Sequence, residues 1–162
     1  MSDESEKIAA RSERMLALFN SIIGQPIQDF PVPPFSKWLN GRVLSAQRGA
    51  VEMEFDVRPE MANPTGLLHG GMQCAAMDDV IGITCATLGY EGFLISIDFH
   101  VDYLGKVKVG ETVRVSAAIQ REGRNIVNAH ADIFDKDGQL IATANSNLIK
   151  TSHKLDLEKF RE

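Results

Sequence analysis

Two neighbouring acids and a glycine-rich turn are the residues of this chain whose types and spacing suggest chemistry. Asp78 and Asp79 lie near the middle of segment 72–88, which is rich in Met, Ala, Ile, Val, Cys and Leu and has no proline. Such a segment is typical of a buried helix that is apolar nearly all the way round. Burying an ionised carboxylate is costly unless it is paired or hydrogen-bonded. The acids therefore indicate a reactive site.

The turn His69-Gly70-Gly71 stands directly in front of this segment. The first four N–H groups of a helix have no partner inside the helix, and two glycines leave them open to a ligand. Such a position attracts negative charge, including the oxyanion that develops on a carbonyl under attack. Paired glycines also fit a turn that simply packs closely, so the glycines alone do not decide between the two interpretations.

The spacing between the turn and the acid restricts how they could work together. His69 and Asp78 are nine residues apart, which on a helix is about 13 Å along the axis. Asp78 therefore cannot act on a carbonyl held at the N-terminus of its own helix. If both belong to one site, Asp78 must come from a second copy of the helix. An antiparallel helix pair across a two-fold axis would form two identical sites per dimer.

The remaining sequence predicts the elements that position these groups. Apolar residues at helical spacing predict a helix over residues 4–23, followed by a stiff, extended proline-rich connector around residues 31–34. Alternation of apolar and polar residues then predicts antiparallel strands. The predicted strands cover residues 42–47, 51–57, 95–103, 111–120, 126–134 and 140–150. Together they form an α+β architecture in which an antiparallel sheet wraps around the long central helix.

Composition restricts the class of protein. The chain has 162 residues, 44% hydrophobic and 24% charged, with a net charge of -5, which suits one domain with a real core. No basic block is present, so nucleic acid is not expected as a partner. Cys74 and Cys85 lie about 16 Å apart on the predicted helix, too far to bridge, and reduced thiols favour a cytoplasmic protein.

Neither the N-terminus nor the central helix predicts a membrane segment. Residues 1–7 are acidic and have no apolar stretch, unlike a signal peptide. The central helix is near the lower length limit for spanning a bilayer, and each of its two aspartates would cost about 2.5–3.5 kcal/mol on insertion. No His, Cys and Asp cluster has the spacing of metal ligands, so a metal site is not expected.

The pattern Asn63-x5-His69-Gly70-Gly71-x6-Asp78 resembles the signature of hotdog-fold acyl-CoA thioesterases of the phenylacetate-pathway and Them2-like branch. The resemblance covers roughly residues 40–150. It implies a hotdog fold, a curved antiparallel sheet around a long central helix, to which this chain adds an N-terminal helix. Gly82 stands where another branch, acting on aryl thioesters, has a threonine, which favours the branch with a serine on the following strand.

The resemblance also implies roles for single residues. Asp78 matches the catalytic carboxylate, acting as nucleophile or as general base for water, and it comes from the neighbouring subunit. Gly70 matches the residue whose N–H polarises the thioester carbonyl. Asn63 matches a loop residue that orients the attacking group or water, and His69 matches the residue that braces the loop. Ser96 matches a serine that assists water, although it could also be a polar residue on the outer strand face.

Coenzyme A is expected as part of the substrate, and no separate cofactor is implied. Gly71 at the helix N-terminus, with Arg121 and Arg124 at a turn, is the expected binding surface for it; Lys106 stands at another turn. The neighbouring acid Asp79 has a plainer interpretation, as a polar contact near the dimer interface.

We therefore expect three parts: residues 1–40 with the N-terminal helix and connector, a thioesterase domain over residues 41–151, and a charged tail over residues 152–162 that forms a short helix or is frayed. The expected activity is hydrolysis of an acyl-CoA to free coenzyme A and a carboxylic acid, by a homodimer that pairs further into a tetramer. Two alternatives are an acyl-thioester hydratase or dehydratase and a non-catalytic acyl-CoA-binding protein. The acyl group is not predicted.

Overall fold

The computed structural model describes residues 3–154 and 156, so most of the predicted tail lies outside the described residues. The elements are α1 (Asp3–Ser21), η1 (Ile27–Asp29), α2 (Pro34–Leu39), β1 (Arg42–Gln47), β2 (Ala50–Asp56), η2 (Pro59–Met61), α3 (Gly70–Ala86), β3 (Gly92–Ser96), β4 (His100–Tyr103), β5 (Thr112–Glu122), β6 (Ile126–Phe134) and β7 (Leu140–Lys154). The predicted order of helices and strands is confirmed, with one additional short helix, α2.

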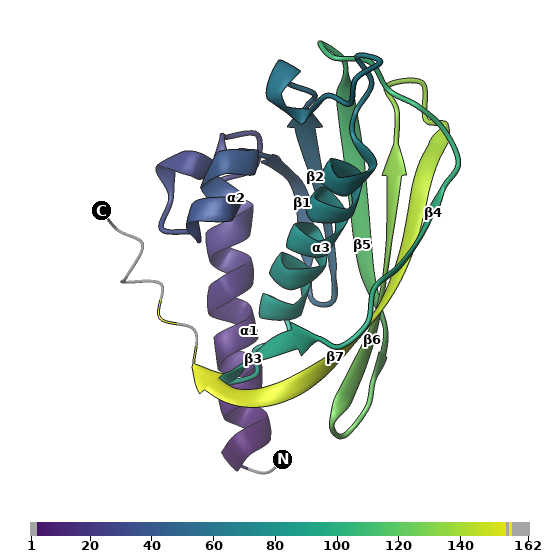
Figure 1. Cartoon of the computed structure of the whole chain (residues 1–162). Helices are drawn as coiled ribbons and strands as arrows, with labels where there is room; N and C mark the ends of the chain where they lie inside the picture. The colour runs from purple at the N-terminus through teal and green to yellow at the C-terminus, as the bar shows by residue number, and fades with distance from the viewer. Residues whose placement is uncertain (1–2, 155, 157–162) are drawn as a thin grey trace.

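The strands form one seven-stranded antiparallel sheet in the order β1-β2-β5-β6-β7-β3, with β4 also paired to β7. Strand β7 is 15 residues long and pairs with β6 along one edge and with β4 and then β3 along the other. The sheet curves around α3, which lies between the sheet and α1 (Figure 1). This is the architecture that the alternating pattern predicted.

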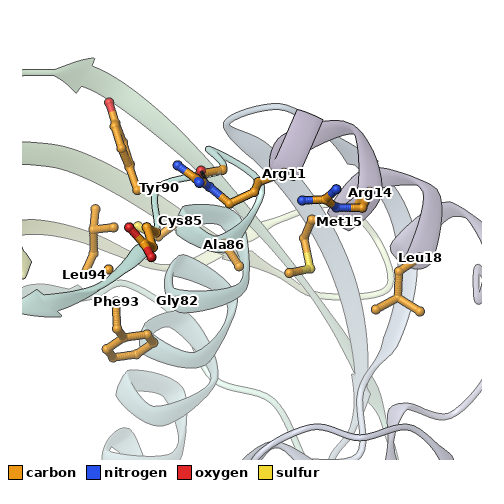
Figure 2. A pocket seen from close by; sticks show the side chains of 13 residues that line it. Arg11, Arg14, Met15, Leu18, Gly82, Cys85, Ala86, Tyr90, Phe93 and Leu94 are labelled. Carbon is orange, nitrogen blue, oxygen red and sulfur yellow. Dashed lines mark hydrogen bonds between the residues drawn. The ribbon is translucent and has the colours of Figure 1, made fainter. Parts of the chain in front are cut away.

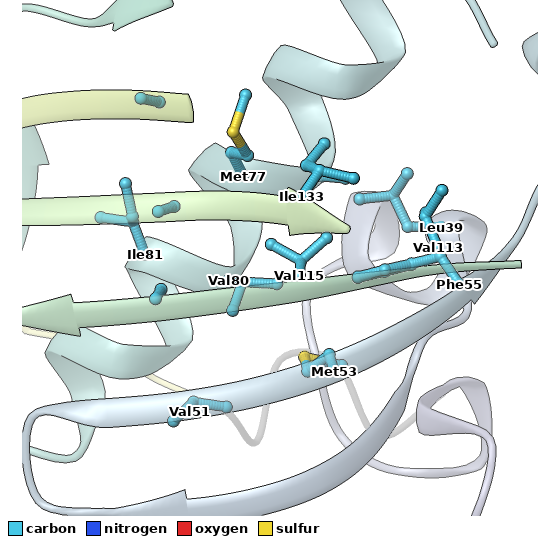
Figure 3. Packing of buried hydrophobic residues seen from close by; sticks show 14 of the residues in the cluster. Leu39, Val51, Met53, Phe55, Met77, Val80, Ile81, Val113, Val115 and Ile133 are labelled. Atoms are coloured by element: carbon cyan, nitrogen blue, oxygen red, sulfur yellow. The ribbon is translucent and has the colours of Figure 1, made fainter. Parts of the chain in front are cut away.

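The core lies between α3 and the inner face of the sheet. Alternate residues of β5, β6 and β7 point inward, as their burial patterns show, because successive side chains of a strand face opposite sides. Figure 3 shows this packing between α3 and the central strands. The fully buried side chains at the centre include Met77, Val80, Ile81, Val115 and Ile133. Burial of each contributes about 1.5–3 kcal/mol.

Helix α1 packs beside β1 and against the C-terminal end of α3 (Figure 1). The Ser12 hydroxyl donates to the carbonyl of Thr87 at 2.6 Å, and Arg11 Nε donates to the carbonyl of Gly89 at 2.7 Å. These bonds satisfy carbonyls just beyond the last turn of α3, where no helical N–H is available. Helix α1 is therefore fastened to the end of the central helix.

Three features differ from the sequence-based expectations. The connector is not extended throughout, because Pro34 begins helix α2, a position where a missing N–H costs nothing. The strand expected over residues 95–103 is divided into β3 and β4 around Asp98, whose carboxylate accepts from the Asn147 N–H at 2.7 Å. Helix α3 is not covered all round, since Asp78 is exposed.

Across residues 3–154, no helix is both long and apolar enough to cross a membrane. Cys74 and Cys85 are both free thiols; Cys74 is half-buried and Cys85 buried.

The packing of α1 on Gly89 predicts a position-specific effect of adding a side chain there. Gly89 has φ +82, and a Cβ would meet the Ile8 carbonyl oxygen and lie 2.7 Å from the Ser12 nitrogen. Gly138 has φ +79 with nothing within 4 Å. Gly138→Ala should therefore lower the free energy of unfolding only by the cost of a left-handed alanine, about 1 kcal/mol. Gly89→Ala should lower the free energy of unfolding by at least about 2 kcal/mol more, because α1 must move to make room for the Cβ.

Urea unfolding of both variants beside the wild type measures this difference. Equal losses for the two variants would show that α1 does not pack on Gly89 in solution.

Candidate active site

Helix α3 begins at a turn in which His69 is the capping residue. Its Nδ1 accepts the Gly71 N–H at 2.9 Å, and its carbonyl accepts the N–H groups of Met72 and Gln73 at 2.9 and 3.1 Å. A Cβ on residue 71 would lie 3.0 Å from His69 Nδ1, tighter than ordinary packing allows. Glycine at position 71 is thus what lets the imidazole cap the helix.

Gly70 keeps an open N–H at this entrance. In the described part of the chain no hydrogen bond takes the Gly70 N–H, whereas the next N–H is used by His69. The Gly70 carbonyl accepts from the Tyr103 hydroxyl at 3.1 Å. The peptide between residues 70 and 71 is therefore held at both its polar groups, which leaves one defined donor in front of the helix.

Tyr103 was not expected at the site. Its ring lies 3.2 Å from where a Cβ of residue 70 would stand, and its hydroxyl is 2.9 Å from Cys74 Sγ. The contact with Cys74, together with partial burial, raises the pKa of Tyr103 to about 12, so the phenol keeps its proton at neutral pH. No pattern in the sequence marked Tyr103 as a site residue, because it continues the apolar alternation of its predicted strand.

Asn63 organises the loop before the helix. Its side-chain oxygen accepts from the Thr65 N–H at 2.9 Å, the Thr65 hydroxyl at 2.7 Å and the Leu67 N–H at 3.2 Å. Such a side-chain turn fixes a loop without help from a regular element. The loop is also tied to the body, because the Leu68 N–H donates to the Val107 carbonyl at 2.8 Å. The oxygen of Asn63 is thus used within its own loop.

The structure brings Asp78 and Ser96 together. The Ser96 hydroxyl donates to Asp78 Oδ1 at 3.1 Å, and both side chains are exposed. It does not bring Asp78 to Gly70 within one chain, since eight residues of helix separate them by about 12 Å. The acid and the open N–H therefore occupy different turns of α3.

Asp79 has the opposite environment from Asp78. It is half-buried, and the buried Ser36 of α2 donates to its Oδ1 at 2.6 Å. Burial raises the pKa of Asp79 to about 6; the nearby Asp78 raises it further and the bond from Ser36 opposes the rise. Asp79 thus links α3 to α2, a contact that sequence patterns did not indicate because α2 was not predicted.

An open groove joins the helix entrance to the acid. It runs along the exposed face of α3 from Gly71 past Cys74 to Asp78, with Ser96 and the residues between β3 and β4 on the other side. A mostly apolar cavity of about 450 Å³ opens beside it, between α3, β3 and the N-terminal segment. Asp78, Asp79 and Ser96 all line this cavity, so the acid stands where groove and cavity meet.

A second cavity of about 340 Å³ lies between α1, the C-terminal half of α3 and β3. Figure 2 shows Arg11 and Arg14 on its α1 side and Phe93 and Leu94 on the opposite side. Cys85 also lines it, and burial raises the pKa of this thiol to about 12. The thiol is therefore an inert part of the wall.

The basic residues expected to bind coenzyme A lie away from the helix entrance of the same chain. Arg121 is the second-last residue of β5, and Arg124 lies in the following turn. Their neighbour Glu122 accepts a hydrogen bond from Tyr90 at 2.8 Å, just beyond the C-terminal end of α3. Since α3 has 17 residues, about 25 Å separates this end from Gly71. Lys106 lies between β4 and β5.

Over residues 3–154, no group of three or more His, Cys, Asp or Glu side chains is arranged to hold a metal ion. The groove itself is lined by the Asp78 carboxylate, the Ser96 hydroxyl and Gly71 at the helix N-terminus.

Comparisons with known proteins bear on the family and the fold. Residues 65–142 match the family model of the thioesterase superfamily. Mouse acyl-coenzyme A thioesterase 13 is 31% identical over 117 residues, which cover 70% of this chain and 82% of the relative. Zebrafish thioesterase superfamily member 2 is 26% identical with a TM-score of 0.71, covering 86% and 97% of the two chains. A Streptococcus mutans protein bound to acetyl-CoA shares the fold at 20% identity and a TM-score of 0.67, covering 72% and 92%.

The curved antiparallel sheet around a central helix places the chain in the class of hotdog-fold proteins. Within that class the chain belongs to the thioesterase superfamily.

The raised pKa of Asp79 predicts a dependence of stability on pH. An aspartate has an ordinary pKa of 3.8, and that of Asp79 is about 6, so the folded state binds the proton more tightly than the unfolded state. The stability from this group is present at low pH and lost as pH rises from about 4 to about 6. Asp79→Asn, which keeps an acceptor for Ser36, should be more stable than the wild type at pH 7 by about 2 kcal/mol.

Thermal unfolding between pH 4 and 7.5 measures this effect, and the extra stability of Asp79→Asn over the wild type should shrink toward pH 4. Ser36→Ala removes the bond that lowers the pKa of Asp79, so the stability of this variant should fall further than that of the wild type as pH rises. A difference between Asp79→Asn and wild type that is constant with pH would contradict the assignment.

Proposed function

We propose that this protein hydrolyses acyl-CoA thioesters, with Asp78 as the catalytic carboxylate. The observation that carries the proposal is the position of Asp78: it accepts from Ser96 at 3.1 Å and lines both the groove from the helix entrance and the apolar cavity. Membership of the thioesterase superfamily and the similarity to mouse acyl-coenzyme A thioesterase 13 support thioester hydrolysis.

The reaction requires attack on the thioester carbonyl and stabilisation of the resulting oxyanion. Asp78 either attacks directly, giving an anhydride that water hydrolyses, or removes a proton from an attacking water. The Gly70 N–H donates to the oxygen that becomes negative. In either route the tetrahedral intermediate collapses by breaking the carbon–sulfur bond, and the thiolate of coenzyme A leaves and takes up a proton. In the direct route this step forms the anhydride, and its hydrolysis releases the carboxylic acid; in the water route the acid is released at once. Ser96 holds the carboxylate and the water in line.

The site is completed by a second copy of the chain. The distance between Gly70 and Asp78 along α3 prevents them from meeting in one chain, and an antiparallel pair of α3 helices would bring each acid to the other entrance. The edge formed by β3, β4 and the residue after it supports such an interface, because it exposes Phe93, Ile95, Ile97, Tyr103 and Leu104. Several large apolar side chains exposed along one part of the sheet edge are typical of a binding interface. We propose a homodimer that pairs into a tetramer.

The same pairing accounts for the distant basic residues. In an antiparallel helix pair, the C-terminal end of one α3 lies beside the N-terminal end of the other. Arg121 and Arg124, which lie near the C-terminal end, would then approach Gly70 and Gly71 of the other copy. Arginine pairs well with phosphate, so we place the nucleotide of coenzyme A there, as a substrate component. The bound acetyl-CoA of the Streptococcus mutans neighbour supports this substrate class.

His69 is a poor candidate for a proton-transfer base of a hydratase or dehydratase. Its Nδ1 accepts the Gly71 N–H, so in the neutral ring the proton is on Nε2, which then has no lone pair to offer. Its position favours hydrolysis, with the imidazole holding the helix entrance.

Asp78→Asn tests the catalytic assignment. Release of free thiol from a panel of acyl-CoAs should fall at least about 100-fold, because the amide cannot act as nucleophile or base. Ser96→Ala should lower kcat by about tenfold and leave KM nearly unchanged. The exposed turn variant Asp137→Asn is the matched control and should keep full activity. Full activity of Asp78→Asn would exclude the proposal.

A pair of substitutions at Gly70 isolates the open N–H. Gly70→Ala keeps the N–H, while Gly70→Pro removes it at a helix position that tolerates proline, and both place a Cβ against the Tyr103 ring. Relative to the alanine variant, the proline variant should lose about 10²–10³ in kcat. Equal activity of the two variants would show that this N–H does not stabilise the oxyanion.

Mixing the two inactive chains tests whether the site is shared. A dimer of one Asp78→Asn chain and one Gly70→Pro chain has one intact site if acid and donor come from different copies. After co-refolding at equal amounts, activity should return to about a quarter of the wild-type value, since half of the dimers are mixed and each has one working site. No recovery would mean that each site belongs to a single chain.

A further inference from the structure

The two cavities adjoin each other along α3, between the acid and α1. Asp78 and Ser96 line the larger one, and Arg11 and Arg14 line the smaller one. Their shared lining residues are Met15, Leu18, Gly82, Ala86, Phe93 and Leu94. An acyl chain that leaves the carbonyl at Asp78 can therefore follow α3 toward its C-terminal end.

The far end of this path differs in chemistry from its walls. Arg11 is already used, because its guanidinium donates to the Gly89 carbonyl and to Glu4. Glu91, the acid in this part of the wall, pairs with Lys154 at 2.5 Å. Arg14 has no hydrogen-bond or ion-pair partner among residues 3–154, and it lines the cavity mouth (Figure 2). The mouth thus presents one uncompensated positive charge at the end of an apolar channel.

Arg14 is exposed, so it can bind an anionic group at the far end of an acyl chain, where that group still contacts solvent, but not an anion inside the apolar cavity. A carboxylate buried in an apolar cavity loses its hydration at high cost. At an open mouth it keeps part of its water and gains a charge-assisted hydrogen bond from a guanidinium, while the methylene groups remain in the apolar channel.

We propose that Arg14 forms an anion subsite for the far end of the acyl group, so that the preferred substrates are acyl thioesters whose chain ends in a carboxylate. This inference rests on the proposed thioester hydrolysis and adds the class of acyl group. The products are then free coenzyme A and a dicarboxylic acid.

The length of the channel sets the length of the chain. Asp78 and Ala86 both line the larger cavity, and Ala86 also lines the smaller one. Eight helical residues separate them by about 12 Å, close to the length of an extended chain of roughly ten carbon atoms. The ten-carbon pair, decanoyl-CoA and the mono-CoA thioester of decanedioic acid, differs only in the terminal group and is therefore the probe.

The test compares kcat/KM for these two thioesters in the wild type, Arg14→Glu and Lys136→Glu. Lys136 is exposed in the turn between β6 and β7 and lines neither cavity, so its substitution makes the same charge change away from the subsite. The wild type should prefer the carboxylated thioester by about tenfold, which corresponds to one charge-assisted bond. Arg14→Glu should remove this preference and leave decanoyl-CoA turnover within about twofold, and Lys136→Glu should change neither.

An equal loss for both thioesters in Arg14→Glu would overturn the inference, because it would assign Arg14 to the phosphates of coenzyme A, which the two substrates share. No preference in the wild type would overturn it as well.

Calorimetric titration of Asp78→Asn with the same two thioesters tests the subsite without turnover. Tighter binding of the carboxylated thioester, lost on adding Arg14→Glu, supports the subsite even if neither is hydrolysed by the wild type, a result that would count against the proposed function alone. Equal affinity for the two thioesters would contradict the subsite whatever the rate.

Discussion

The rigidity of α3 is the constraint on which the rest of the site depends. A helix of 17 residues cannot bend enough to bring its first turn to its middle, so the open N–H of Gly70 and the carboxylate of Asp78 stay about 12 Å apart. The sheet and the N-terminal helices leave part of this helix uncovered, and Asp78 remains exposed there, beside Ser96 of β3. If Gly70 is the oxyanion donor and Asp78 the acid, as proposed, they form a single site only when the helix is duplicated.

The N-terminal segment adds cavity walls to this arrangement. Helix α1 is fastened to the end of α3 through Ser12 and Arg11, and α2 is linked to its middle by the bond from Ser36 to Asp79. Because both helices are attached to α3 at different points, they enclose two cavities with α3 and β3, and the larger of these reaches Asp78. In the proposed reaction the segment would contact the acyl group rather than take part in the chemistry.

Much of the fold could be predicted from the sequence, because local periodicity determines it. The helical pattern and the alternating strands each bury one face, and the hairpin turns join neighbours. For the candidate site, the sequence indicated the turn from His69 to Gly71 by its spacing, and it indicated Asp78 and Ser96 only through the resemblance to a family; the structure places these two within hydrogen-bond distance. Tyr103 contacts Gly70 and Ser36 contacts Asp79 across 33 and 43 residues, and no local pattern reports such pairs.

The two adjacent acids show why position in the fold outweighs position in the sequence. Successive helical residues point about 100° apart, so Asp78 faces the groove and Ser96, whereas Asp79 faces α2 and Ser36. Burial raises the pKa of Asp79 to about 6. Its Oδ1 accepts a hydrogen bond from the Ser36 hydroxyl, which links α3 to α2. An attacking group needs both solvent and substrate within reach. Of the two acids, only Asp78 lines the groove that runs from the helix entrance, and this selects it for the chemistry.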